Sequence, residues 1–159
     1  TTEAMRKQAE KQQQLVAENA YVIAADPKDN LKAPEAEKDI PYLDFSPLQN
    51  ALASVKTSVH YFSKTDFTSL SASKQKMVNA KLKDLEKALL SESGLPRRPW
   101  FKHQIYAPGF YTGYGVKTLP GVREAIEQKN FEEAQEQIEK LAKTLTVFKG
   151  KLDEIVKMG

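Results

Sequence analysis

Residues 94–121 read GLPRRPWFKHQIYAPGFYTGYGVKTLPG, and this stretch separates two regions whose apolar spacing is helical. It holds six of the fourteen aromatic residues of the chain, half of the 8 prolines and five of the 7 glycines. A connection longer than about 12–15 residues is uncommon in a compact domain unless it is functional or disordered. Disordered segments are poor in aromatic residues, so the sequence predicts a long, ordered, irregular loop at about 94–120.

The aromatic residues of this loop permit two interpretations. They can form a small satellite core beneath a surface loop, or they can line a binding surface, and the residues alone favour the two about equally. The residues in question are Trp100, Phe101, Tyr106, Phe110, Tyr111 and Tyr114.

The region after the loop is predicted to form a short helix and a long last helix. The short helix starts at Pro120 and ends near Gln128, and the NFEE sequence of residues 130–133 is a capping box that opens the last helix. The apolar residues of the last helix recur at alternating spacings of three and four, which is the pattern of a heptad seam. These residues are Phe131, Ala134, Ile138, Leu141, Leu145, Phe148, Leu152 and Ile155. A free coiled coil would also fit, but the other amphipathic helices of the chain favour a bundle.

Two further helices are predicted before the loop. Ser46 can cap the first of them, Pro47 fits its first position, and Gln49 completes a capping box. The second begins at Ser71 or Ser73 and is ended by the GLP sequence at 94–96. The predicted buried face is Leu48, Leu52, Val55, Val59 and Phe62 in the first helix, and Met77, Val78, Leu82, Leu85 and Leu89 in the second.

The first part of the chain is predicted to be one helix followed by an extended segment. Residues 2–25 have helical spacing, and their polar first half is either solvated or covered by a part of the protein outside this chain. Three prolines then predict an extended crossover at about 27–42. The predicted fold is all-α: one four-helix-bundle-like domain over residues 1–159, with this crossover and the irregular loop.

Composition limits the classes of function. The 159 residues are enough for one domain with a core, and no apolar run of about 18 residues could span a membrane. The start, Thr1-Thr2-Glu3, has no Met and no apolar leader, which is typical of an excised fragment. The chain has no cysteine and a net charge of +3. Its basic residues between 74 and 98 fit a solvated helix face better than a nucleic-acid footprint.

The residues alone form no recognisable catalytic set. Of the two histidines, His60 lies on a helix face, where a structural role is more common than a catalytic one, and His103 lies far from it in the sequence. Metal-binding, nucleophile-elbow and phosphate-loop motifs do not occur. This chain by itself is therefore not expected to be an enzyme, and no metal site is expected within it.

The loop sequence resembles a known family. The LPRRPWFKHQIYAP sequence at 95–108 is similar to the segment that opens the irregular part of the C-terminal helical domain in the glutamate carboxypeptidase II and transferrin receptor family. Tyr114 and the LPG sequence at 119–121, followed by a short and a long helix, continue the match in register. The resemblance is strongest over residues 94–130 and weakest before Pro41. It implies a transferrin receptor-like dimerisation domain, with a bacterial-type zinc peptidase as the expected parent protein.

The resemblance also implies partners and a cofactor. Family members combine a zinc peptidase domain, a protease-associated domain and this helical domain, and the first two would lie outside this chain. Two zinc ions are implied for the peptidase domain and none for this chain. The implied partners are a second copy, the upstream peptidase domain and a peptide substrate, without nucleic acid or a membrane span. The implied location is extracytoplasmic, either periplasmic or secreted.

The resemblance implies roles for individual loop residues. In glutamate-preferring members, an adjacent Lys-Tyr pair of this loop binds the substrate, and the matching positions here are Gly113 and Tyr114, with Thr112 beside them. Tyr114 keeps a phenol that can donate to a carboxylate, whereas Gly113 provides no cation, so glutamate specificity is not implied. Lys117 could replace the cation only along a different loop path. The residues expected to anchor the loop are Lys102, His103, Tyr106 and Pro108.

Three hypotheses about function remain open at this point. The first is a non-catalytic domain that mediates a homodimer contact and adds a loop to the substrate pocket of a zinc exopeptidase. The second is the same domain in a receptor-type relative that has lost its metal ligands. The third is an autonomous helical binding module, for which the basic residues between 74 and 98 would be the candidate surface.

Overall fold

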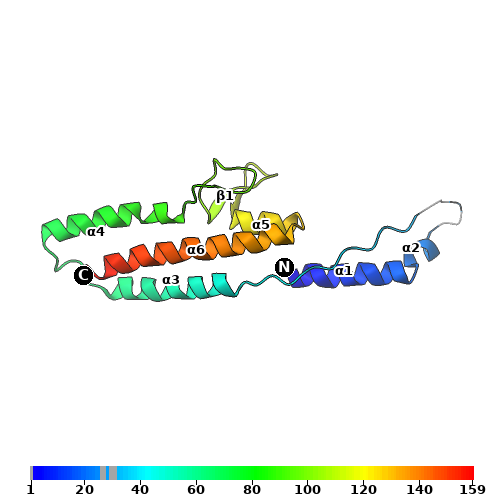
Figure 1. Ribbon diagram of the computed structural model, residues 1–159, viewed down its shortest axis with the longest axis horizontal. Coiled ribbons are helices and arrows are strands. Elements are labelled where there is room, and N and C mark those ends of the chain that lie inside the picture. The colour runs from blue at the N-terminus through cyan, green and yellow to red at the C-terminus, as the bar shows by residue number, and fades with distance from the viewer. Residues whose placement is uncertain (1, 26–27, 29–31) are drawn as a thin grey trace. The chain divides into compact units, whose positions relative to one another are not determined.

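The computed structural model describes residues 2–25, 28 and 32–159. The chain divides into two compact units, Thr1–Tyr42 and Leu43–Gly159. The protein is mostly helical and has one small two-stranded sheet in its described part (Figure 1).

The first unit contains two helices where the sequence predicts one. Helix α1 (Thr2–Ala17) and the short helix α2 (Ala20–Ile23) are separated at Asn19, whose φ of 53° is left-handed. Asparagine tolerates this conformation better than most residues because its short side chain can bond locally. The prediction of one continuous helix over 2–25 is therefore wrong at this point.

The polar residues of α1 bind the extended segment that follows. Arg6 Nε donates to the Ile40 carbonyl at 3.1 Å, and Gln13 Nε2 donates to the Glu37 carbonyl at 2.7 Å. Gln12 Oε1 accepts from the Glu37 backbone N–H at 2.8 Å. The predicted extended crossover is confirmed from residue 32 to residue 42, and residues 26–27 and 29–31 of the predicted region lie outside the described residues.

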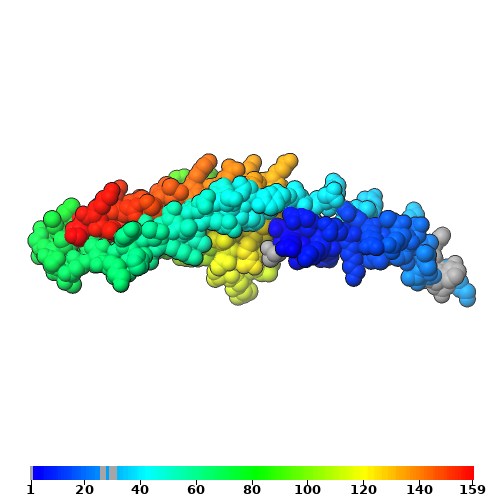
Figure 2. All heavy atoms as spheres, turned by 90° about the horizontal axis from the view of Figure 1, so that it is seen from below, coloured from blue at the N-terminus to red at the C-terminus, as the bar shows by residue number. Residues whose placement is uncertain are grey.

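The second unit is built around its last helix. Helix α6 (Phe131–Val156) contacts α3 (Ser46–Lys64), α4 (Ala72–Leu85), the 3-10 helix η1 (Glu86–Leu89) and α5 (Pro120–Glu127). Figure 1 shows α6 running between α3 and α4, and Figure 2 shows the surface over α3 with α6 beside it. The short helix and the last helix match their predicted positions. The arrangement of four helices around one core stays a prediction.

The predicted seam of α6 is confirmed at six of its eight positions, and the other two, Phe131 and Phe148, are half-buried. Ile138 and Ile155 are completely buried, and each contributes about 1.5–3 kcal/mol by its removal from water. The seam residues Ala134, Leu141, Leu145 and Leu152 are buried with them. At the start of the helix, Asn130 Oδ1 accepts from the Glu133 N–H at 3.3 Å as a capping residue should, while the Glu133 carboxylate pairs with Arg97. Half of the predicted capping box is therefore formed.

The buried face of α3 matches the predicted one in part, because Leu48, Val55 and Phe62 are half-buried and the first two pack against the core. Ala51 and Ser58 are buried, whereas Leu52 and Val59 are 45% and 48% exposed. Small residues allow close helix packing, and the Ser58 hydroxyl is satisfied by Asp153 Oδ1 at 2.5 Å, so burying it leaves no polar group unpaired. A pattern search for large apolar residues cannot find such a face.

Two smaller predictions about α3 and α4 also change. Ser46 does not cap α3; it is the first helical residue, and its N–H donates to Asp44 Oδ1 at 2.9 Å. Ser71 does occupy the capping position of α4, as predicted, but its hydroxyl lies 3.2 Å from the Ser73 hydroxyl. In α4, Val78 is buried as predicted and Met77 is 56% exposed, contrary to prediction.

The long loop contains a hairpin that the sequence reading missed. Strand β1 (Tyr106–Pro108) pairs antiparallel with β2 (Val116–Thr118), with Tyr106 opposite Thr118. Three-residue strands are too short for a clear alternation of apolar and polar residues. The all-α prediction is therefore correct for the layers of the fold and incomplete for the loop.

Candidate functional site

The candidate site is the loop at 94–120, and its first half is bonded to η1. Gln104 N–H donates to the Leu89 carbonyl at 2.9 Å, and Ser91 N–H donates to the Lys102 carbonyl at 2.9 Å. Leu119 N–H donates to the Ile105 carbonyl at 2.7 Å, which joins the two halves of the loop. The backbone path of the loop is thereby fixed at its base.

A glycine and a lysine hold the first turn of the loop. Gly94 has a φ of +63°, and a Cβ at this position would lie 2.2 Å from the Pro99 carbonyl oxygen. The turn therefore needs glycine both for its conformation and for its close approach. Lys140 of α6 donates to the Gly94 carbonyl at 2.6 Å and to Ser93 Oγ at 2.8 Å. Burial lowers the pKa of Lys140.

A buried ion pair joins the loop to α5. Arg98 Nη2 donates to Glu124 Oε2 at 2.6 Å, and the two side chains are only 7% and 6% exposed. Arg98 Nη1 also donates to the Pro108 carbonyl at 2.6 Å, and Glu124 Oε1 accepts from the Phe110 N–H at 2.8 Å. Charge-assisted bonds of this kind are about twice as strong as neutral ones. The pair therefore fixes both the first and the middle part of the loop.

Aromatic rings cover this ion pair. The guanidinium carbon of Arg98 lies 5.3 Å from the Phe101 ring centre and 5.2 Å from the Phe110 ring centre, within the range of cation–π attraction. Next to it, Arg97 forms two bonds to the Glu133 carboxylate, at 2.7 and 2.8 Å. This hydrogen bonding raises the pKa of Arg97. The inner aromatic residues thus form the satellite core that the sequence allows.

The four predicted anchoring residues contact other parts of the loop, η1 or the short segment between η1 and the loop. His103 Nδ1 lies 3.2 Å from the Ile105 N–H and 3.3 Å from the Tyr106 N–H, and accepts from both. Tyr106 donates to Glu86 Oε1 at 3.0 Å, Lys102 pairs with Glu92 at 2.6 Å, and the Pro108 carbonyl accepts from Arg98. Their anchoring role stays a prediction.

The environments of His103 and Tyr106 shift their pKa values in opposite directions. Burial lowers the pKa of His103, and the nearby Glu86 carboxylate only partly offsets this. The hydrogen bond to Glu86 raises the pKa of Tyr106. The His103 ring stacks on Tyr106 with 4.0 Å between ring centres. A neutral His103 fits this geometry, because its Nδ1 acts as an acceptor.

The candidate pocket residues Thr112, Gly113 and Tyr114 lie together at the tip of the loop. All three are exposed, and Tyr114 is fully exposed. The tip turns back through the Gly115 N–H, which donates to the Thr112 carbonyl at 2.9 Å. Lys117 is directed away from the tip by its ion pair with Glu127 at 2.5 Å. The structure therefore presents the Tyr114 phenol on a base that is held firmly.

Sequence reasoning missed the residues that hold this base. Arg98, Glu124 and Lys140 were not singled out as structural partners, and they come from three segments that only the fold brings together. Glu124 could have been suspected, because a carboxylate between the apolar residues Val122 and Ala125 of a short helix needs a buried partner.

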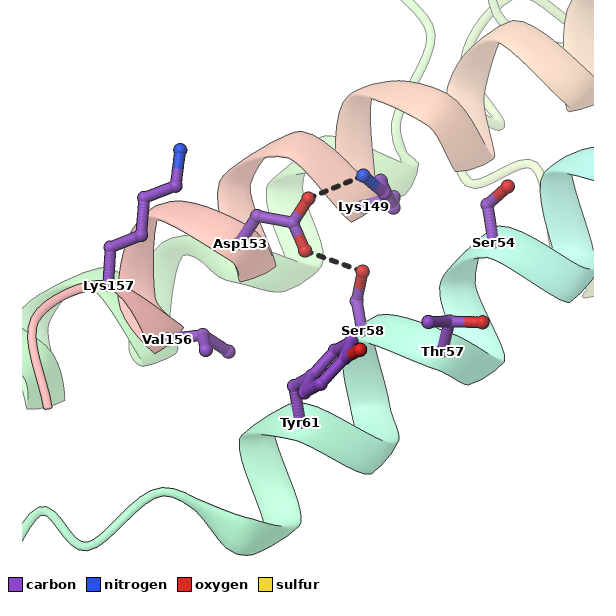
Figure 3. Close-up of a pocket in the computed structure, with 8 residues that line it drawn as sticks. All are labelled: Ser54, Thr57, Ser58, Tyr61, Lys149, Asp153, Val156 and Lys157. Carbon is purple, nitrogen blue, oxygen red and sulfur yellow. Dashed lines mark hydrogen bonds and ion pairs between the residues drawn. The ribbon is translucent and has the colours of Figure 1, made fainter.

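Apart from the loop, the surface has a hollow between α3 and α6. It has a volume of about 400 Å³ and contains Asp153 between Ser58 and Lys149, as Figure 3 shows. Both contacts to Asp153 are 2.5 Å long, and they lower the pKa of this carboxylate, Lys149 more than Ser58. No histidine lines the hollow to act as a base toward Ser58, so the geometry does not favour nucleophilic catalysis.

Neither a metal-binding cluster nor a membrane-spanning helix occurs among the described residues. They contain no group of three or more His, Asp or Glu side chains that could hold a metal ion. No helix among them is both long and apolar enough to cross a bilayer.

Comparison with known proteins agrees with this architecture. Residues 43–153 match the family of transferrin receptor-like dimerisation domains. A probable glutamate carboxypeptidase of Arthroderma benhamiae is 32% identical over 126 residues, which are 77% of this chain and 17% of that protein. A probable glutamate carboxypeptidase of Arabidopsis thaliana is 30% identical over 151 residues, 88% of this chain and 22% of that protein.

A third relative is described as catalytically inactive. An inactive zinc metalloprotease of Schizosaccharomyces pombe is 34% identical over 67 residues, 42% of this chain and 8% of that protein. The chain thus spans about a fifth or less of the length of these relatives. The family match covers most of the second unit, from the end of the extended segment almost to the end of α6. The chain belongs to the transferrin receptor-like dimerisation domain family.

Proposed function

We propose that this chain is the non-catalytic C-terminal domain of a glutamate carboxypeptidase-like zinc exopeptidase. In this proposal the domain mediates homodimer contact, and its loop at 94–120 completes the substrate pocket beside an upstream peptidase domain. In the same proposal, residues 1–159 form one four-helix-bundle-like domain, and the protein acts outside the cytoplasm.

The geometry of the loop carries the pocket part of the proposal. The buried Arg98–Glu124 pair makes the base of the loop rigid, and the Tyr114 phenol stands exposed at its tip. A rigid base with a free phenol suits a group that must meet a ligand held by another domain. In this proposal Thr112 and Gly113 shape the tip, His103 and Tyr106 hold the loop to η1, Pro108 holds it to Arg98, and Lys102 holds it to Glu92.

The substrate preference and the metal follow from the same proposal. The phenol of Tyr114 would donate to a carboxylate of the peptide substrate, and Gly113 leaves that carboxylate without a cation from this position. Zinc would be bound by the peptidase domain, since the described residues of this chain offer no cluster of ligands. This chain would therefore influence substrate binding and not the chemical step.

The test is the hydrolysis of peptides by the full-length protein and by its Tyr114→Phe variant. We expect a raised KM with a nearly unchanged kcat, because removing the hydroxyl removes binding to substrate and transition state alike. Tyr21→Phe, which removes the same group from α2, is the control and should leave both constants unchanged. Unaltered kinetics of Tyr114→Phe on every hydrolysed peptide would remove Tyr114 from the pocket.

The similarity to an inactive metalloprotease supports a second candidate. In that case the domain has the same role in dimer contact, but the parent protein is a receptor-type relative without zinc ligands. The zinc content of the purified full-length protein separates the two: about two ions per chain for the peptidase, as in two-metal hydrolases, and none for the inactive relative.

A further inference from the structure

One face of α6 carries a row of mostly exposed residues. Counted from Glu139, the members follow at alternating spacings of four and three, so they share one face of the helix. They are Glu139, Lys143, Thr146, Gly150, Asp153 and Lys157, the last of which directly follows the helix. All are exposed except Asp153, which is partly buried. We name this set the α6 row.

The α6 row borders two hollows between α3 and α6. The first, of about 460 Å³, is lined by Pro47, Val147 and members of the row; the second, of about 400 Å³, is the one in Figure 3. The middle of the row is shallow, because Thr146 is small and nothing lies within 4 Å of a Cβ placed on Gly150. Another helix can therefore approach α6 closely here.

The charges of the α6 row are self-complementary when the row is read in opposite directions. In an antiparallel pair of identical rows centred between Thr146 and Gly150, Glu139 faces Lys157 and Lys143 faces Asp153. A two-fold axis repeats each contact, because residue i facing j implies that j faces i. In a parallel pair, each charged residue would face the same residue of the other copy, so like charges would meet. If the antiparallel register were shifted by seven residues, the Glu139–Lys157 and Lys143–Asp153 pairs would both be lost.

The two ends of the α6 row are available for these contacts. Within the described part of the chain, neither Glu139 nor Lys157 forms an ion pair with another side chain. Asp153 already pairs with Lys149 and accepts from Ser58, so Lys143 of a second copy would join an existing ion pair. Val147 and Tyr61, which line the same two hollows, are 53% and 60% exposed and add apolar surface.

The other exposed apolar face suits a second copy less well. Leu52 and Val59 of α3 are accompanied by Lys56 and Lys64, and α3 contains no acidic residue. Two copies meeting through α3 would bring like charges together, which is unfavourable in an interface.

We propose that the α6 row is the surface through which two copies of this chain pair, antiparallel and across a two-fold axis. This inference rests on the proposed role in homodimer contact and specifies the surface and the residue pairs. Salt should weaken the contact, because charges at the edge of an interface are screened by ions.

The test is a charge swap followed by analytical ultracentrifugation of the full-length protein over a concentration series. Glu139→Lys alone and Lys157→Glu alone should each weaken dimerisation about tenfold or more, because each places like charges together twice. The double variant Glu139→Lys/Lys157→Glu should return the affinity to near the wild-type value. Glu10→Lys, which makes the same change of net charge on α1, is the control and should have no effect.

Cross-linking gives an independent readout of the register. The chain has no cysteine, so Thr146→Cys/Gly150→Cys should form a disulfide-linked dimer on mild oxidation. Lys76→Cys/Ala80→Cys, an exposed pair of the same spacing on α4, should not. A wild-type dimer that ignores the charge reversals and cross-links equally at both pairs would overturn the α6 row while leaving dimerisation intact. A full-length protein that stays monomeric would overturn both.

Discussion

At the scale of single residues, the Arg98–Glu124 pair shows how a buried charge is made tolerable. Removing two charges from water costs several kcal/mol per ion, which the pair recovers only with good geometry and further hydrogen bonds. Both conditions hold here, because each partner also bonds to the backbone of the loop, at Pro108 and Phe110. The pair therefore constrains the conformation of the loop.

Replacing one partner of this pair should be costly. Glu124→Gln keeps an acceptor for the Phe110 N–H but leaves Arg98 buried without a counter-charge, so we expect a loss of about 3 kcal/mol in the free energy of unfolding. Urea denaturation of the 159-residue chain measures this loss. Glu127→Gln breaks the more exposed pair with Lys117 and should cost less than about 1 kcal/mol. Equal losses in the two variants would show that breaking the buried Arg98–Glu124 pair costs no more than breaking the more exposed Lys117–Glu127 pair.

His103 should make the stability of the loop depend on pH. Burial lowers its pKa below the ordinary value of 6.5, so the unfolded chain binds more protons than the folded one as the pH falls through about 6.5. The free energy of unfolding should therefore decrease between about pH 7.5 and 5.5, the range in which histidines titrate.

The measurement is the difference in unfolding free energy between these two pH values. The decrease should be smaller in His103→Gln, which lacks the titrating ring. A wild-type decrease that persists fully in His103→Gln would assign the pH dependence to other groups.

At the scale of elements, the buried face of a helix could be predicted from the sequence only where the helix buries large apolar residues. Helix α6 was found from sequence because its seam consists of large apolar residues at regular spacing. Helix α3 is predicted at the correct residues, but part of its buried face differs from the prediction. It packs through Ala51 and Ser58 and leaves Leu52 exposed. The break at Asn19 was missed because a left-handed residue leaves the apolar spacing on either side unchanged.

The loop shows the same limit at the site. Its order and its inner aromatic cluster follow from composition, and the position of Tyr114 follows from the family resemblance. The Arg98–Glu124 contact joins residues 26 positions apart, and no local pattern reports a pairing at that distance. The contacts that support the loop therefore could not be predicted from local sequence.

At the scale of the whole molecule, the two units differ in the core that each can form. Among the described residues of the first unit, Ala9 and Ile40 are the buried apolar ones, whereas the second unit buries the seam of α6 together with residues from α3, α4, α5 and the loop. Chains of about 40 residues rarely fold without disulfides, metals or partners, and an isolated helix the length of α1 is marginal in water.

These differences predict that residues 43–159 fold without residues 1–42. The shortened chain should show cooperative urea unfolding with a midpoint close to that of the 159-residue chain, because every seam residue of α6 and every contact of the Arg98–Glu124 pair remains present. A peptide of residues 1–42 should be largely unfolded by circular dichroism, since it would have to order α1 and the extended segment around two buried apolar side chains. If residues 43–159 instead unfolded without cooperativity, the core of the second unit would depend on the first unit for its stability.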